Sequence, residues 1–177
     1  MMWIAALAML ASGVQDGPAL TPGTVTVEAV ADEATPVAVR QVFADAVEQA
    51  LLDARFIALP RQARGRYIAR ISLTRAERGA VASNGREQGA SGGFGNWGGA
   101  VSVTLPSDKR QLRGLIVTTL KVELVSRADE RLVWSGSALT AQAEGTRNDT
   151  PSALAAKLAP AVIRAFPATL AEPLSVP

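Results

Sequence analysis

The sequence predicts an α+β fold, in which a mainly antiparallel sheet of about five strands carries two helices packed on one face as a two-layer sandwich. Three observations lead to this class. A long alternating stretch indicates a β-hairpin, two amphipathic segments each begin at a Thr-Pro pair, and the elements follow the order strand, helix, strands, helix. Short connections favour antiparallel strands, and two one-sided helices need one sheet face to cover.

The predicted hairpin runs from Leu112 to Gln142. Alternate residues of its first half fall on one face of an extended chain, and we expect that face to be buried. They are Ile116, Thr118, Leu120, Val122 and Leu124. After a polar break at 126–130, a run rich in β-branched and aromatic residues places Trp134 near the centre of the second strand, as a core residue.

The first part of the chain predicts a strand over Thr24–Val30 and then a helix, with Thr35 as its N-cap and Pro36 at its first position. A second helix begins in the same way at Thr150-Pro151. Between them, alternation from about residue 66 to 75 predicts a strand whose Arg66 and Arg70 point to solvent.

A glycine-rich segment from Gly79 to Ala100 departs from any core-building pattern, with eight glycines among its 22 residues. We predict a mobile loop there. Phe94 and Trp97 have little core to enter within such a loop, and aromatic side chains are common anchors at interfaces. They are therefore candidate partner-binding residues, although either could instead fold back over the sheet. A short strand, 101–105, follows the loop.

The domain organisation expected from the sequence is simple. Residues 1–13, MMWIAALAMLASG, are typical of a signal peptide cleaved near Gly13, and 14–23 of a flexible mature N-terminus. Residues 24–170 then form a single domain, and 171–177 form a tail. The apolar run is shorter than the roughly 18 residues of a membrane span, so we expect no transmembrane helix. A periplasmic location follows if the source is a Gram-negative bacterium.

Positive charge is concentrated between residues 55 and 78, although the net charge of the whole chain is only +2. This segment contains seven arginines and a single acidic residue, Glu77. The arginines are Arg55, Arg61, Arg64, Arg66, Arg70, Arg75 and Arg78. A basic stripe can meet anionic lipid or nucleic acid, but it can equally be a solvated strand face. The export signal disfavours nucleic acid.

The composition argues against most enzyme classes. With neither cysteine nor histidine, the chain lacks thiolate chemistry and the side chain most used for acid–base work near neutral pH. Residues 93–98, GFGNWG, match the dinucleotide fingerprint GxGxxG, but a strand rather than a helix is expected to follow. We predict no catalytic, cofactor-binding or metal-binding residues. Paired carboxylates leave a hydrolase as an alternative, and the candidate residues are Asp32, Glu33, Glu123, Asp129, Glu130 and Asp149.

A set of short motifs resembles bacterial domain of unknown function 4136. The matching residues are Phe43 and Leu51 leading into Phe56-Ile57, the strand Ala69–Leu73, Leu132-Val133-Trp134-Ser135-Gly136 and Ala165-Phe166-Pro167. The resemblance covers about residues 24–170 and implies an exported, often lipidated envelope protein with no established activity. It implies no functional residues. The chain has no cysteine to carry a lipid, which departs from many members.

Three hypotheses for function follow. The first is a non-enzymatic periplasmic accessory or adaptor protein that binds another envelope component, either a protein or an anionic lipid or glycolipid. Its expected contact residues are Phe94, Trp97, Arg66 and Arg70. The second is a soluble carrier or sensor of a small or lipidic ligand held between helices and sheet. The third is a carboxylate-dependent hydrolase of wall polymer or glycan. The sequence does not specify the oligomeric state.

Overall fold

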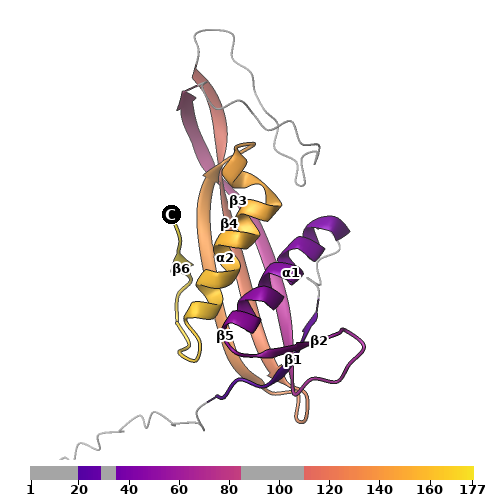
Figure 1. The fold of residues 1–177 in the computed structure, drawn as a ribbon. Helices are drawn as coiled ribbons and strands as arrows, with labels where there is room; N and C mark the ends of the chain where they lie inside the picture. Colours follow the sequence, from indigo (N-terminus) through magenta and orange to yellow (C-terminus); the bar gives the residue numbers. More distant parts are fainter. Residues whose placement is uncertain (1–19, 29–34, 85–109) are drawn as a thin grey trace, which may run out of the picture.

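A computed structural model of the chain describes residues 20–28, 35–84 and 110–177. Within them, six strands form one sheet in the order β2-β1-β3-β4-β5-β6. The elements are β1 (Thr24–Glu28), α1 (Val37–Asp53), β2 (Ile57–Leu59), β3 (Tyr67–Asn84), β4 (Arg110–Ser126), β5 (Leu132–Ala143), the 3-10 turn η1 (Arg147–Asp149), α2 (Pro151–Arg164) and β6 (Leu174–Ser175). The α+β class is confirmed, and Figure 1 shows both helices over the same face of the sheet.

The expectation of a mainly antiparallel sheet is wrong, because the sheet is mixed. β4 pairs antiparallel with β3 and β5, whereas β1 runs parallel to both β2 and β3, and β5 runs parallel to β6. The physical reason at one edge is α1, which carries the chain back along the helix face so that β2 enters beside β1 in the same direction. Both β2 and β6 were missed because they have only 3 and 2 residues. The predicted strand 101–105 lies outside the described residues.

The core lies between the helices and the sheet, and the alternation predicted for the hairpin is confirmed. All five residues assigned to the inner face of β4 are at most 5% exposed. They are Ile116, Thr118, Leu120, Val122 and Leu124. From the helices, the largest fully buried side chains are Val39, Phe43, Val47 and Leu51 of α1 and Leu154, Leu158 and Val162 of α2. The opposite face of the sheet is not covered by either helix (Figure 1).

Trp134 is a core residue, as predicted, with 2% of its surface exposed. Its indole Nε1 donates a hydrogen bond to the carbonyl of Ala168 at 3.0 Å. The ring lies over Gly136, the next residue on the same face of β5, where an added Cβ would stand 2.6 Å from the indole Cη2 atom. The glycine two residues after the tryptophan is therefore required by close packing.

The two helices begin differently. Thr150 caps α2 as predicted, because its Oγ1 accepts a hydrogen bond from the backbone nitrogen of Ala153 at 3.4 Å. In α1 the cap is Pro36, so the assignment of Thr35 is wrong. Pro36 has an extended ψ of 141°, and its carbonyl accepts from the Arg40 nitrogen at 3.0 Å. Proline provides the first carbonyl of the helix but no side-chain acceptor.

Candidate interaction surfaces

Arg66 and Arg70 point to solvent, as predicted, and both are exposed. Neither is an isolated charge. The Arg66 guanidinium lies 5.1 Å from the centroid of the Tyr67 ring, and Arg70 Nε is 3.5 Å from Glu28 Oε2 on β1. Exposed ion pairs of this kind contribute little to stability, so Arg70 stays available to exchange its partner.

The open sheet face around Arg70 carries charges of both signs. In register with Arg70 lies Glu123 of β4, whose Oε1 is 2.5 Å from the Nζ of Lys121. Ser72 and Thr74 continue the same face of β3 and are exposed. This face is therefore mixed in charge around Arg70, and it is not the uniformly basic stripe that one interpretation of the arginine count predicted.

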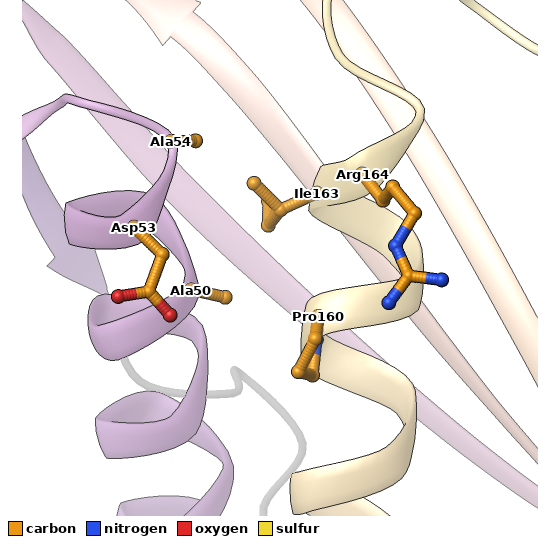
Figure 2. A pocket seen from close by; sticks show the side chains of 6 residues that line it. All are labelled: Ala50, Asp53, Ala54, Pro160, Ile163 and Arg164. Carbon is orange, nitrogen blue, oxygen red and sulfur yellow. The ribbon is translucent and has the colours of Figure 1, made fainter.

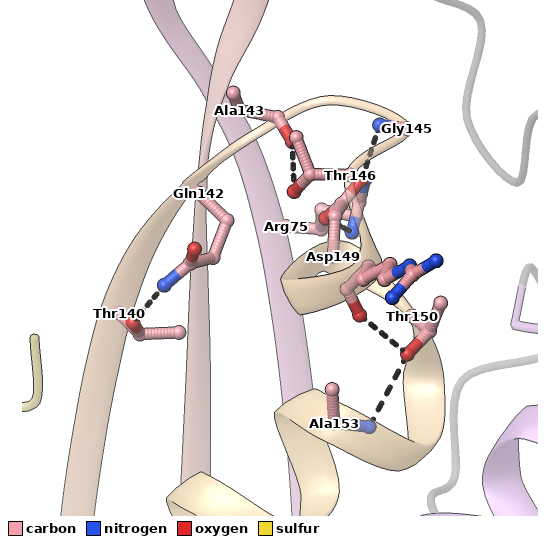
Figure 3. A network of polar contacts seen from close by, with 10 residues as sticks. Arg75, Thr140, Gln142, Ala143, Gly145, Thr146, Asp149, Thr150 and Ala153 are labelled. Atoms are coloured by element: carbon pink, nitrogen blue, oxygen red, sulfur yellow. Dashed lines mark hydrogen bonds and ion pairs between the residues drawn. The ribbon is translucent and has the colours of Figure 1, made fainter. Parts of the chain in front are cut away.

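Arg75 departs from that stripe because it lies on the helix face of β3. Its Nη1 and Nη2 atoms donate to Asp149 Oδ1 and Oδ2, both at 2.7 Å, and Asp149 is 7% exposed (Figure 3). Asp149 also accepts from the backbone nitrogen of Gly145 at 3.0 Å, where φ is 70°. The bidentate pair thus ties β3 to the connection between β5 and α2.

Among the carboxylates considered for hydrolysis, those that the structure describes do not converge on one site. Asp149 pairs with Arg75, and Glu123 pairs with Lys121. Asp129 lies exposed in the turn after β4, where a hydrogen bond from the Ser126 side chain is the main reason that its pKa lies below the ordinary value. Asp32 and Glu33 lie outside the described residues.

One carboxylate pair was missed by the sequence analysis. Glu77 of β3 and Glu144, just after β5, flank Gly114 of β4, and each places a carboxylate oxygen 3.3 Å from the position of a Cβ at that glycine. No sequence pattern marks this pair, because it depends on the register of three strands. Within the described ranges, no three His, Cys, Asp or Glu side chains form a group that could hold a metal.

The predicted start of the mobile loop at Gly79 is wrong, because β3 continues to Asn84. Its last residues pair with β4 from Ala80↔Gly114 to Asn84↔Arg110. The register shifts between Glu77 and Ala80, and Gly79 adopts a φ of 132°, which an L side chain rarely tolerates. Gly79 therefore lies in a β-bulge within the strand, at a position that favours glycine.

Residues 80–84 and 110–114 form a two-stranded segment, which we call the ribbon. β5 pairs with β4 only from Leu115 onward, and β1 pairs with β3 only over Tyr67–Arg70. No described strand therefore covers either edge of the ribbon. In Figure 1 the ribbon extends past the start of α2 and beyond the helix layer.

The expected contact residues are only partly placed by the structure. Arg66 and Arg70 lie together at the β1 end of the sheet. The ribbon lies at the other end of β3, and Arg70 and Asn84 are roughly 45 Å apart at the usual rise per residue (Figure 1). Phe94 and Trp97 fall between the two ribbon strands in sequence and lie outside the described residues. The arginines and the ribbon are thus separate surfaces.

The fold and surfaces define a two-layer α+β domain with one open sheet face and a projecting ribbon. No helix in the described ranges is long and apolar enough to cross a membrane. No family model and no curated protein matches the chain, so the resemblance to domain of unknown function 4136 is not confirmed.

Three solved structures show partial similarity. The PelC dodecamer from Paraburkholderia phytofirmans is 17% identical over 83% of this chain and 90% of that one, with a TM-score of 0.46. XCC0632 from Xanthomonas campestris, of domain of unknown function 330, is 14% identical over 84% and 81%, with a TM-score of 0.41. A neuraminyllactose-binding hemagglutinin homolog from Helicobacter pylori is 8% identical over 71% and 66%, with a TM-score of 0.39. Likenesses this low carry no argument about family or function.

Proposed function

We propose that this chain is a non-enzymatic accessory or adaptor protein of the periplasmic cell envelope, and that it binds another envelope component through the ribbon. The observation that carries the proposal is the ribbon itself. It extends from the body of the sheet, and no described strand covers either of its two edges. The expected location in the periplasm rests on the apolar N-terminal segment of the sequence.

The physical argument starts from the stability of such a ribbon. A two-stranded segment is only marginally stable in water, and its edges expose unpaired backbone donors and acceptors. Residues 76–80, at its base, are all exposed. A segment of this kind gains the most stability when a partner supplies a further strand or a covering surface, because main-chain hydrogen bonds to the partner then replace hydrogen bonds to water. In the sequence, the segment between the two ribbon strands contains Phe94 and Trp97, the aromatic anchors expected from the sequence.

A double substitution tests this function. We expect Phe94→Ala with Trp97→Ala to weaken association with the envelope fraction by roughly tenfold or more, as loss of aromatic anchors does at interfaces. Because the proposal places both side chains at the contact surface and not in the core, the melting temperature should stay within a few degrees of wild type. A matched control is Trp134→Ala, which removes a core aromatic and should lower stability instead.

Two outcomes would contradict the proposal. In the first, the double variant associates as well as wild type does. In the second, it loses folding to the same extent as Trp134→Ala, which would make the loop aromatics part of the core and not of a contact surface.

A further inference from the structure

A groove separates the C-terminal halves of α1 and α2, away from the ribbon. It is open to solvent, has a volume of about 280 Å³ and is lined by six residues, Ala50, Asp53, Ala54, Pro160, Ile163 and Arg164. Figure 2 shows the groove between the two helices, with Asp53 on one wall and Arg164 on the other. The volume lies just below the range of roughly 300–1,000 Å³ found for small-molecule sites.

The two charged residues do not neutralise each other by direct contact. No ion pair joins Asp53 to Arg164 among the contacts of the described residues. Asp53 Oδ1 instead accepts a hydrogen bond from Gln49 Nε2 at 3.1 Å, one turn earlier on α1. Alanine and isoleucine side chains line the space between the charges. The groove is therefore an apolar slot with an acid on one wall and a base on the other.

Both helices depart from ordinary helix chemistry at this groove. Asp53 stands at the C-terminal end of α1, where the helix dipole disfavours a negative charge, and the last turn of α1 has no basic residue. Pro160 lies inside α2, where its missing N–H leaves the carbonyl of Ala156 without a helical donor. Departures of this kind in otherwise consistent elements are expected at functional sites.

These groups match one class of ligand. An ammonium group is favoured beside the Asp53 carboxylate at the C-terminal end of α1, because the carboxylate accepts hydrogen bonds and the helix dipole there favours positive charge. Arg164 on the opposite wall can donate two parallel hydrogen bonds to a carboxylate. We propose that the groove binds a small zwitterion of the amino-acid class, with its ammonium at Asp53, its carboxylate at Arg164 and its aliphatic side chain on Ile163.

This inference goes beyond the adaptor function and does not depend on it, because the groove and the ribbon use different elements. L-Leucine is a suitable probe, in a titration of the full chain followed by the amide signals in NMR. Saturable shifts are expected at Ala54 and Ile163, and none at Thr74 on the open sheet face. Isopentylamine, which lacks the carboxylate, and 4-methylpentanoate, which lacks the ammonium, should each bind roughly tenfold or more weakly, because each loses one charge pair.

Variants separate recognition from a structural role. Asp53 and Arg164 are both exposed, so Asp53→Asn and Arg164→Gln should keep the fold, as checked by circular dichroism. Each is expected to weaken leucine binding roughly tenfold or more. Asp45→Asn is the matched control, since Asp45 is an exposed acid of α1 outside the groove. The proposal is overturned if leucine causes no saturable shift at Ala54 and Ile163, or if Asp45→Asn weakens binding as much as Asp53→Asn.

Discussion

At the residue scale, Gly136 packs closely against Trp134. A Cβ at position 136 would lie 2.6 Å from the indole and 3.2 Å from the Val162 side chain, both in the core. Because a shift of either neighbour would disturb the layer between α2 and β5, a larger residue at this position should be destabilising.

We therefore predict that Gly136→Ala lowers the free energy of unfolding by about 1–3 kcal/mol, the usual cost of overpacking a core. Urea denaturation measures the change. Gly114→Ala is the control, because its Cβ would meet only the ends of the Glu77 and Glu144 side chains, at 3.3 Å. Equal stability of Gly136→Ala and wild type would contradict this account.

The Arg75–Asp149 pair leads to a second prediction. The two side chains are 18% and 5% exposed, and replacing one partner leaves the other charge largely desolvated. Asp149→Asn should therefore cost about 3 kcal/mol of stability. Glu28→Gln, which breaks the exposed pair with Arg70, should cost less than about 1 kcal/mol. Thermal or urea unfolding compares the two variants, and similar losses in both would refute the assigned difference in burial.

Asp129 gives a prediction about pH. Its pKa lies below the ordinary 3.8, first because of the Ser126 side-chain hydrogen bond. Since the folded pKa is the lower one, the contribution to stability is present above the unfolded pKa and is lost as the pH falls through the folded value. Ser126→Ala should raise the pKa of Asp129 toward 3.8, as measured by NMR titration of its carboxyl carbon. An unchanged pKa would show that the hydroxyl is not responsible.

At the element scale, the strands that the sequence predicted well are those with long alternation. The inner face of β4 and the central position of Trp134 were predictable because period-two burial extends over many residues. β2 and β6 were not, since two or three residues show no period, and the parallel pairing of β1 arises from how α1 packs. Thr35 was misassigned because a Thr-Pro pair is compatible with either residue as the cap.

The ribbon was missed for a different reason, namely that glycine content favours a loop prediction regardless of strand register. Gly79 has a φ of 132°, and no atom lies within 4 Å of the place that a Cβ would take there, so only backbone strain opposes substitution. We predict that Gly79→Ala weakens the ribbon by about 1 kcal/mol and leaves the body intact. Amide hydrogen exchange should become faster at residues 80–84 and stay unchanged at Leu120. Unchanged exchange at 80–84 would contradict the bulge assignment.

At the scale of the whole molecule, the helices cover one face of the sheet, neither helix covers the other face, and the ribbon projects past the helix layer (Figure 1). Of the candidate contact residues, Arg66 and Arg70 are exposed as predicted, and Phe94 and Trp97 remain predictions. Neither the Glu77–Glu144 pair nor the groove at Asp53 and Arg164 was predictable, because each joins residues far apart in the sequence through tertiary packing.

The most direct test of the ribbon as a contact surface is photocrosslinking in intact cells. A photoreactive residue is placed at position 80 at the base of the ribbon or at position 97, with comparison positions 70 on the open face and 120 in the core. We expect one discrete crosslinked protein or glycolipid from positions 80 and 97, and none from position 120. If positions 80 and 97 give no product, the ribbon is not a contact surface and the adaptor function is contradicted.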